Sequence, residues 1–177
     1  MIADVVLRWV VTGVFVACSG YCTSRLVIRG GRIEQFNLFA HLLMAIAMIA
    51  MAWPSGMGVP AGPQVVVFGL AAVWLVVQAL LARRPWMKGA HGTHQHPIAL
   101  WYHAFMMGAM VLMVVMMGRA GEWIAPTAVA VAAIFAFAAI RWIAAAVRRP
   151  RERHCVVERI YEVLMAAGMA SMFFVMG

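Results

Sequence analysis

Charge is scarce in this chain. Only 11% of its 177 residues are charged, and just six residues are Asp or Glu. Soluble domains carry about 25% charged residues. Hydrophobic residues reach 66% instead, and the mean hydropathy is +0.91. This composition excludes a soluble protein and predicts a single transmembrane domain over residues 1–177, with the lipid bilayer as its partner.

Cysteine is also scarce, and several catalytic motifs are missing. Three cysteines are too few for a disulfide framework. Cys18 and Cys22 stand one helical turn apart, so they could share one Cu(I) ion or serve as small apolar filler, which is the interpretation we favour. The sequence has no glycine-rich phosphate loop, no nucleophile elbow and no metalloprotease histidine pair. We therefore expect no enzymatic activity.

Six apolar runs fill the chain. Each has near twenty residues, enough to cross a hydrocarbon core roughly 30 Å thick. The runs cover residues about 5–24, 36–53, 64–82, 98–117, 125–147 and 160–176. The sequence therefore predicts an all-α membrane protein with six transmembrane helices.

The net charge of +8 comes from basic residues between the apolar runs. Most of the fourteen Lys and Arg residues follow the first, third and fifth runs, whereas the segments after the second and fourth hold only Arg119. Basic loops face the cytoplasm. This placement predicts a cytoplasmic-membrane protein with both termini extracytoplasmic, and it excludes nucleic acid as a partner. The basic loop residues are Arg25, Arg29, Arg32, Arg83, Arg84, Lys88, Arg148, Arg149, Arg151, Arg153 and Arg159.

One pattern occurs three times, on the second, fourth and sixth runs. Each copy begins with a ligand-type residue, followed by methionines at +3, +7 and +10. Such offsets fall on one face of a helix. The copies recur about every sixty residues, so the chain divides into three two-helix units at about 1–58, 59–119 and 120–177. The copies are His41, Met44, Met48 and Met51; His103, Met106, Met110 and Met113; and Glu162, Met165, Met169 and Met172.

The repeat and the topology together predict a pseudo-threefold bundle. The second, fourth and sixth helices run in one direction and line a central axis, and the other three form an outer ring. The two histidines and the glutamate then share one level near the cytoplasm, with three methionine layers beyond them over about 15 Å. Small residues beside the methionines, including Gly108 and Gly168, are expected to let the inner helices approach closely.

The methionine stripes point to a soft metal ion. Thioether sulfur is an uncharged ligand that selects Cu(I) over hard cations, and stacked weak sites let an ion leave as well as enter. The Met-x3-Met spacing resembles that of the trimeric copper transporters, whose three chains build stacked methionine rings. The resemblance covers the motif and not the helix count. It implies copper(I) binding or conduction. The spacing is met by Met44 and Met48, Met106 and Met110, and Met165 and Met169.

As a whole, the chain is similar to an uncharacterised family of small bacterial multi-span membrane proteins. These carry a repeated His-x2-Met-x3-Met-x2-Met motif, and the resemblance implies no function. Two other interpretations stay open. Methionine could simply pack helix interfaces, in a structural subunit of a membrane complex or homo-oligomer. Alternatively, His41 and His103 could be the axial ligands of a b-type haem.

Two further features bear on a metal site. Glu162 stands where a third histidine would complete the symmetry, so a symmetric site is in doubt. His91, His94 and His96 form a cluster in the segment after the third run. Histidine-rich tracts often bind metal, although a solvated polar loop explains this cluster equally well.

Overall fold

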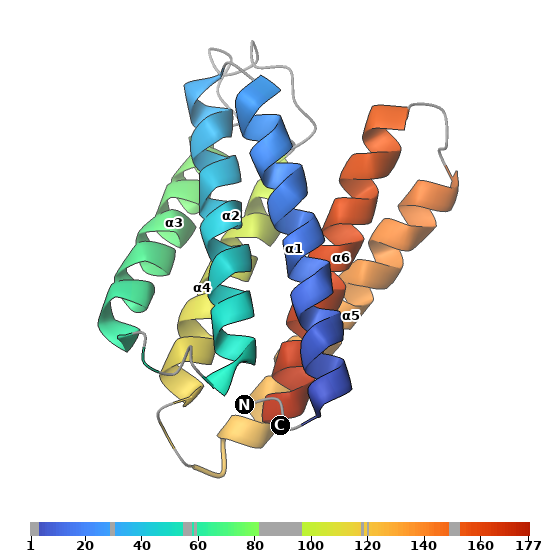
Figure 1. The fold of residues 1–177 in the computed structure, drawn as a ribbon. Coiled ribbons are helices and arrows are strands. Elements are labelled where there is room, and N and C mark those ends of the chain that lie inside the picture. The colour runs from blue at the N-terminus through green and yellow to red at the C-terminus, as the bar shows by residue number, and fades with distance from the viewer. Residues whose placement is uncertain are drawn as a thin grey trace.

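The chain folds into six α-helices, and the described residues contain no strand (Figure 1). The computed structural model describes residues 4–28, 31–54, 58, 60–81, 97–117, 119, 121–148 and 153–177. The histidine cluster at His91, His94 and His96 lies outside these residues. The predicted six-helix, all-α class is confirmed. The helices are α1 (Val5–Ile28), α2 (Arg32–Ala52), α3 (Ala61–Leu81), α4 (Pro97–Met117), α5 (Ile124–Arg148) and α6 (Arg153–Met176).

Local chemistry explains where α1 begins and α2 ends. The Asp4 carboxylate accepts the backbone N–H groups of Val6 and Leu7, at 2.7 and 3.3 Å, and so caps the start of α1. Pro54 disfavours helical backbone at the residue before it. Trp53 is accordingly extended, with φ −104° and ψ 147°, and α2 stops there.

The outer surface of the helices is apolar. Each of the six is long and apolar enough to cross a membrane. Large apolar side chains point outward on α1, α3 and α5, where Val6 is 71% exposed, Leu70 66% and Ile140 64%. Contiguous apolar surface of this kind is unfavourable in water and favourable against lipid tails. The chain is therefore a multi-pass membrane protein, as predicted.

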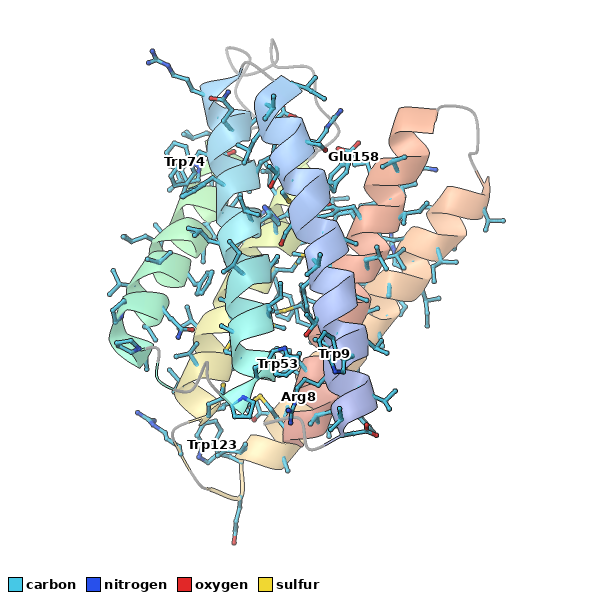
Figure 2. All side chains as sticks on the ribbon, viewed as in Figure 1. Arg8, Trp9, Trp53, Trp74, Trp123 and Glu158 are labelled. Carbon is cyan, nitrogen blue, oxygen red and sulfur yellow. The ribbon has the colours of Figure 1, made fainter. Side chains whose placement is uncertain are left out.

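Tryptophans lie toward both ends of the bundle (Figure 2). Trp9, Trp53 and Trp123 lie toward the end that holds both termini, and Trp74 lies toward the other end. The rings of Trp9 and Trp53 meet edge to face with 5.0 Å between centroids, and the Arg8 guanidinium lies 5.3 Å from the Trp53 ring centre. Tryptophan favours the boundary between lipid and water, so rings toward both ends agree with a bilayer that the helices cross.

The helices pair as three hairpins. The closest packing joins α1 to α2, α3 to α4 and α5 to α6. Helices α2, α4 and α6 run in the same direction, so the three repeat copies point the same way (Figure 1). The hairpins do not contact one another equally, because α1 packs along α6 whereas α2 approaches α3 over a shorter length. The bundle therefore departs from a regular threefold arrangement.

Burial separates inner from outer helices. Within the apolar core of each helix, 44% of α2, 56% of α4 and 44% of α6 is buried inside the protein. The corresponding shares are 22% for α1 and 28% for both α3 and α5. The three helices that carry the repeat thus form the interior, as the sequence predicts.

The role predicted for Gly108 and Gly168 is wrong. The inner helices α2, α4 and α6 are not among the closely packed pairs. A Cβ on Gly168 would lie 2.7 Å from Cζ of Phe15, so this glycine lets α1 approach α6. A Cβ on Gly108 would have nothing within 4 Å. Close approach therefore occurs between an inner and an outer helix.

These two glycines give a matched pair of substitutions. We expect Gly168→Ala to lower the free energy of unfolding by about 1–3 kcal/mol, because the buried Phe15 ring must move. Gly108→Ala should be neutral or stabilising by up to about 1 kcal/mol, since alanine favours helix and the space is open. Thermal unfolding in detergent measures both. Equal melting temperatures for the two variants would contradict the assigned packing.

Two side-chain amides join α2 to α3. Asn37 Nδ2 donates to Gln78 Oε1 at 3.1 Å, and Gln78 Nε2 donates to Asn37 Oδ1 at 2.9 Å. Trp74 Nε1 donates to the same Asn37 oxygen at 3.3 Å. Within a membrane such groups must find partners in the protein, so this reciprocal pair fixes the first hairpin against the second.

Removing one of these amides should loosen that link. We expect Gln78→Leu to lower the free energy of unfolding by about 1 kcal/mol, within the range of hydrogen bonds between membrane helices. Gln64→Leu is the control, because Gln64 lies about four turns earlier on α3 and is not hydrogen-bonded to Asn37. If chemical unfolding in mixed micelles gave the same free energy of unfolding for both variants, the hydrogen bonds between Asn37 and Gln78 would not contribute to stability.

Candidate functional site

All twelve residues of the repeat lie inside the protein. His41 is 4% exposed, His103 2% and Glu162 3%. The nine methionines are no more than 5% exposed. Intramembrane ionisable groups are costly to bury and commonly face the interior of a bundle where they serve function. The predicted candidates thus occupy one continuous interior. Those methionines are Met44, Met48, Met51, Met106, Met110, Met113, Met165, Met169 and Met172.

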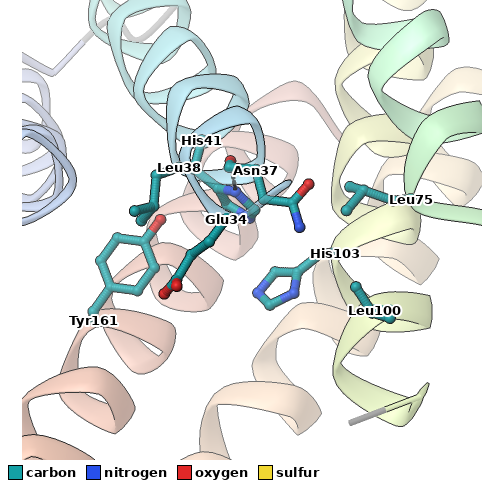
Figure 3. A pocket seen from close by; sticks show the side chains of 8 residues that line it. All are labelled: Glu34, Asn37, Leu38, His41, Leu75, Leu100, His103 and Tyr161. Atoms are coloured by element: carbon teal, nitrogen blue, oxygen red, sulfur yellow. Dashed lines mark hydrogen bonds between the residues drawn. The ribbon is translucent and has the colours of Figure 1, made fainter. Parts of the chain in front are cut away.

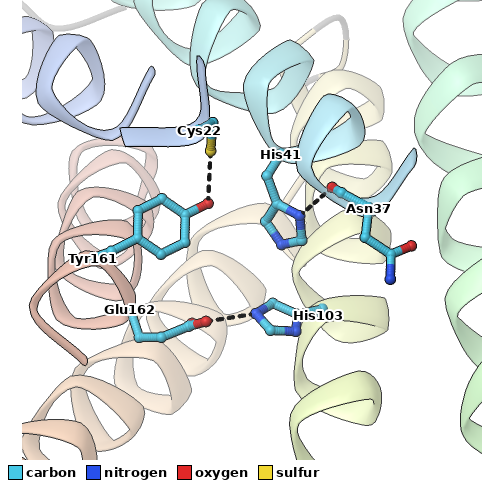
Figure 4. Close-up of polar contacts among 6 residues, drawn as sticks. All are labelled: Cys22, Asn37, His41, His103, Tyr161 and Glu162. Atoms are coloured by element: carbon cyan, nitrogen blue, oxygen red, sulfur yellow. Dashed lines mark hydrogen bonds and ion pairs between the residues drawn. The ribbon is translucent and has the colours of Figure 1, made fainter. Parts of the chain in front are cut away.

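The first residues of the three copies meet at one level (Figure 4). The rings of His41 and His103 stand edge to face, with 4.6 Å between centroids and 89° between planes. His103 Nε2 lies 2.8 Å from Glu162 Oε1, in a hydrogen bond that joins α4 to α6. The sequence alone predicted that these residues share one depth, and the structure brings them into direct contact.

Backbone chemistry fixes the orientation of His41. Its Nδ1 lies 2.7 Å from the backbone carbonyl oxygen of Asn37, one turn earlier on α2. A carbonyl oxygen can only accept, so Nδ1 carries the hydrogen and donates it. In the neutral ring Nε2 is then the acceptor nitrogen. Histidines that bind metals commonly have this arrangement, because the second hydrogen bond orients the ring.

The contact among His41, His103 and Glu162, called the polar level from here on, sets the expected register of the methionines. Helices α2, α4 and α6 run in one direction, and their copies use identical offsets from this level. Each residue advances a helix by 1.5 Å, so equal offsets reach about equal depth. Met44, Met106 and Met165 follow the polar level first, and the last methionines lie about 15 Å beyond it. The interior therefore changes from polar to sulfur-rich along its length.

The polar level does not form a metal site of carboxylate, imidazole and thiol groups alone. Within the described parts of the chain, no three His, Cys, Asp or Glu side chains are arranged to hold a metal ion. His103 and Glu162 instead bond to one another. A cation held in this interior would therefore depend on methionine sulfur as well, and the metal role of the twelve residues stays a prediction.

Tyr161 extends the polar level to α1. Cys22 Sγ donates to the Tyr161 hydroxyl at 3.4 Å, and the Tyr21 ring lies 4.8 Å from the Tyr161 ring (Figure 4). Cys18 and Cys22 are both buried, with free thiols. Burial alone does not distinguish apolar filler from two thiols that share one Cu(I) ion, so the filler role of these cysteines stays a prediction. No spacing rule pointed to Tyr161, because its partner lies 139 positions away.

A hollow borders the polar level, and its lining reaches Glu34 in the first turn of α2, at the end of the bundle opposite the termini (Figure 1 and Figure 3). Its cavity volume is about 10 Å³, which is roughly the space that one water molecule needs. Both repeat histidines line it, and so does a carboxylate that the sequence analysis did not single out. Its lining residues are Glu34, Asn37, Leu38, His41, Leu75, Leu100, His103 and Tyr161.

Comparison with known proteins places this chain in a family. It is 32% identical to uncharacterised proteins of Mycobacterium bovis (strain ATCC BAA-935 / AF2122/97) and Mycobacterium tuberculosis (strain ATCC 25618 / H37Rv), over 99% of this chain and 98% of each relative. No solved structure matches. The comparisons give no support to the likeness with trimeric copper transporters, and they confirm membership of an uncharacterised family. Residues 33–176 match the model of the family described as "Domain of unknown function (DUF5134)", and the chain belongs to this family.

Proposed function

We propose that this protein binds copper(I) within the membrane and conducts or buffers it there, without enzymatic activity. One observation carries the proposal. The three methionine stripes lie on the three inner helices, which run in one direction, and every methionine in them is buried. A single chain thus supplies the three-sided arrangement of sulfur that layered copper(I) sites require.

The chemistry of the interior suits a soft monovalent cation. Thioether sulfur binds Cu(I) without adding charge, so methionine layers can remain in an apolar interior when no ion is bound. Hard cations such as Mg²⁺ prefer oxygen ligands and gain little from sulfur. Several weak layers in series also allow an ion to move from one layer to the next.

The polar level has a separate part in this proposal. Glu162 accepts from His103 at 2.8 Å and thereby orients the imidazole, as carboxylates do behind metal-binding histidines. The backbone carbonyl of Asn37 likewise orients the other imidazole of this ring contact, because it accepts the hydrogen bond from His41 Nδ1. The two histidines would therefore present nitrogen to an ion before it reaches the first sulfur layer.

The haem and packing alternatives are less well supported. The rings of His41 and His103 touch edge to face, whereas a haem would need its two axial histidines on opposite faces of the porphyrin. Simple packing does not require the same three offsets on three helices, since methionine adapts to irregular gaps wherever they occur. No contact among the described residues favours a second function over copper(I) binding.

Replacing one sulfur layer tests the proposal. The triple variant Met48→Leu, Met110→Leu and Met169→Leu keeps volume nearly constant, so the free energy of unfolding should fall by less than about 1.5 kcal/mol per site. Copper(I) affinity should fall at least about tenfold, because three soft ligands are lost together. Competition with a coloured copper(I) chelator measures the affinity, and thermal unfolding checks the fold.

A control variant separates sulfur chemistry from packing. Met107 and Met116 are buried on α4 and lie outside the repeat. The double variant Met107→Leu and Met116→Leu should therefore keep wild-type copper(I) affinity. Equal affinities for the wild type, the layer variant and this control would overturn the metal site and leave methionine as packing.

We further propose that the protein lies in the cytoplasmic membrane with both termini extracytoplasmic. Both termini lie at one end of the bundle, as an even number of spans requires (Figure 1). Arg25 and Arg32 stand at the other end, where the positive-inside rule places the cytoplasm. The polar level would then face the cytoplasm.

Reporter fusions test this orientation. Alkaline phosphatase fused after Gly177 should be active, because that enzyme folds only outside the cytoplasm, and green fluorescent protein at the same site should be dark. The same reporters inserted at His94 should give the opposite pattern. A fluorescent fusion after Gly177 would reverse the proposed orientation.

A further inference from the structure

The face of α2 that carries His41 and the repeat methionines also carries polar residues nearer the start of the helix. Glu34, Asn37 and His41 precede Met44 at spacings of three, four and three residues, which continue the alternation of the methionines. This alternation keeps all of them on one face of α2. Glu34 lies seven residues, or about 10 Å, before His41 along the helix.

The hollow joins this outer part of the stripe to the polar level. Figure 3 shows the Glu34 side chain pointing toward the space between Tyr161 and His103. His41 and His103 line the inner part, and leucines from α2, α3 and α4 complete the wall. Among the described residues that line the hollow, Glu34 is the only acidic one.

We propose that this hollow is the entrance through which a monovalent soft cation reaches the interior, and that Glu34 is its capture group. The inference rests on the proposed function and adds a route and a residue to it. An arriving cation meets basic residues at this end of the bundle, including Arg25 and Arg32. A carboxylate at the mouth offsets their repulsion and raises the local cation concentration. The ion would pass from the carboxylate oxygen of Glu34 to the imidazole nitrogens of His41 and His103, and from these to the methionine sulfurs.

A charged group at an entrance changes the rate at which copper(I) enters the protein, and it leaves the final amount of bound copper(I) unchanged. We expect Glu34→Gln to slow copper(I) loading at least about tenfold at low salt, the lower end of electrostatic steering, and the difference should shrink at high salt. Stopped-flow ultraviolet absorption of the copper–sulfur band after mixing with a copper(I) complex gives the rate. Final copper content should equal that of the wild type.

Glu122→Gln is the matched control. It removes the same charge from an exposed position next to Trp123, which lies at the other end of the bundle (Figure 2), so it should load at the wild-type rate. Equal rates for the wild type and both variants would overturn the entrance while leaving the copper proposal intact. A lower final content in Glu34→Gln would place Glu34 in the storage site and also overturn its capture role. A wild-type protein that takes up no copper(I) would overturn both proposals.

Chemical modification varies the charge at this position without a change of fold. Glu34→Cys, made together with Cys155→Ser, leaves the buried native pair Cys18 and Cys22 as the remaining thiols. A negatively charged thiosulfonate reagent should restore fast loading, and a positively charged reagent of similar size should slow it further. Equal loading after both reagents would mean that the charge at this position has no part in the route.

Discussion

The hydrogen bond between His103 and Glu162 is the interaction on which the interior depends. It joins α4 to α6 at 2.8 Å, and His41 of α2 completes the level by resting its ring against His103. A membrane offers no water to these groups, so each must find its partner inside the protein. Their meeting fixes the relative height of three helices. Because every methionine of the repeat is a set number of residues from this level, the same contact predicts that methionines with equal offsets lie at about equal depth.

The outer helices hold this interior in place through different contacts. α1 approaches α6 at Gly168, and its Cys22 thiol donates to Tyr161 beside the polar level. α3 holds α2 through Gln78 and Asn37, and the backbone carbonyl of Asn37 orients His41. The side-chain hydrogen bonds between Gln78 and Asn37 thus help to hold the residue whose carbonyl orients His41, a candidate metal ligand. Unequal contacts of this kind explain why a threefold sequence repeat gives an imperfectly threefold bundle.

The spans, the inner helices and the burial of the twelve residues could be predicted from the sequence, because hydrophobicity and helical period are local properties. Contacts between helices could not be predicted in the same way. Gly168 faces Phe15 of α1 because of how α6 is rotated, and rotation depends on the whole bundle. Glu34 was missed because it lies outside the repeat, although the alternating spacing of α2 already included it. Tyr161 carried no spacing signal.

The proposed copper(I) site depends on buried methionine sulfur as the ligand. X-ray absorption spectroscopy of the purified, copper(I)-loaded protein tests it most directly, because the technique reports which elements surround the metal. We expect a shell dominated by sulfur in a protein whose thiols Cys18, Cys22 and Cys155 have been replaced by serine. A shell of nitrogen and oxygen only, or a protein that retains no copper, would contradict it.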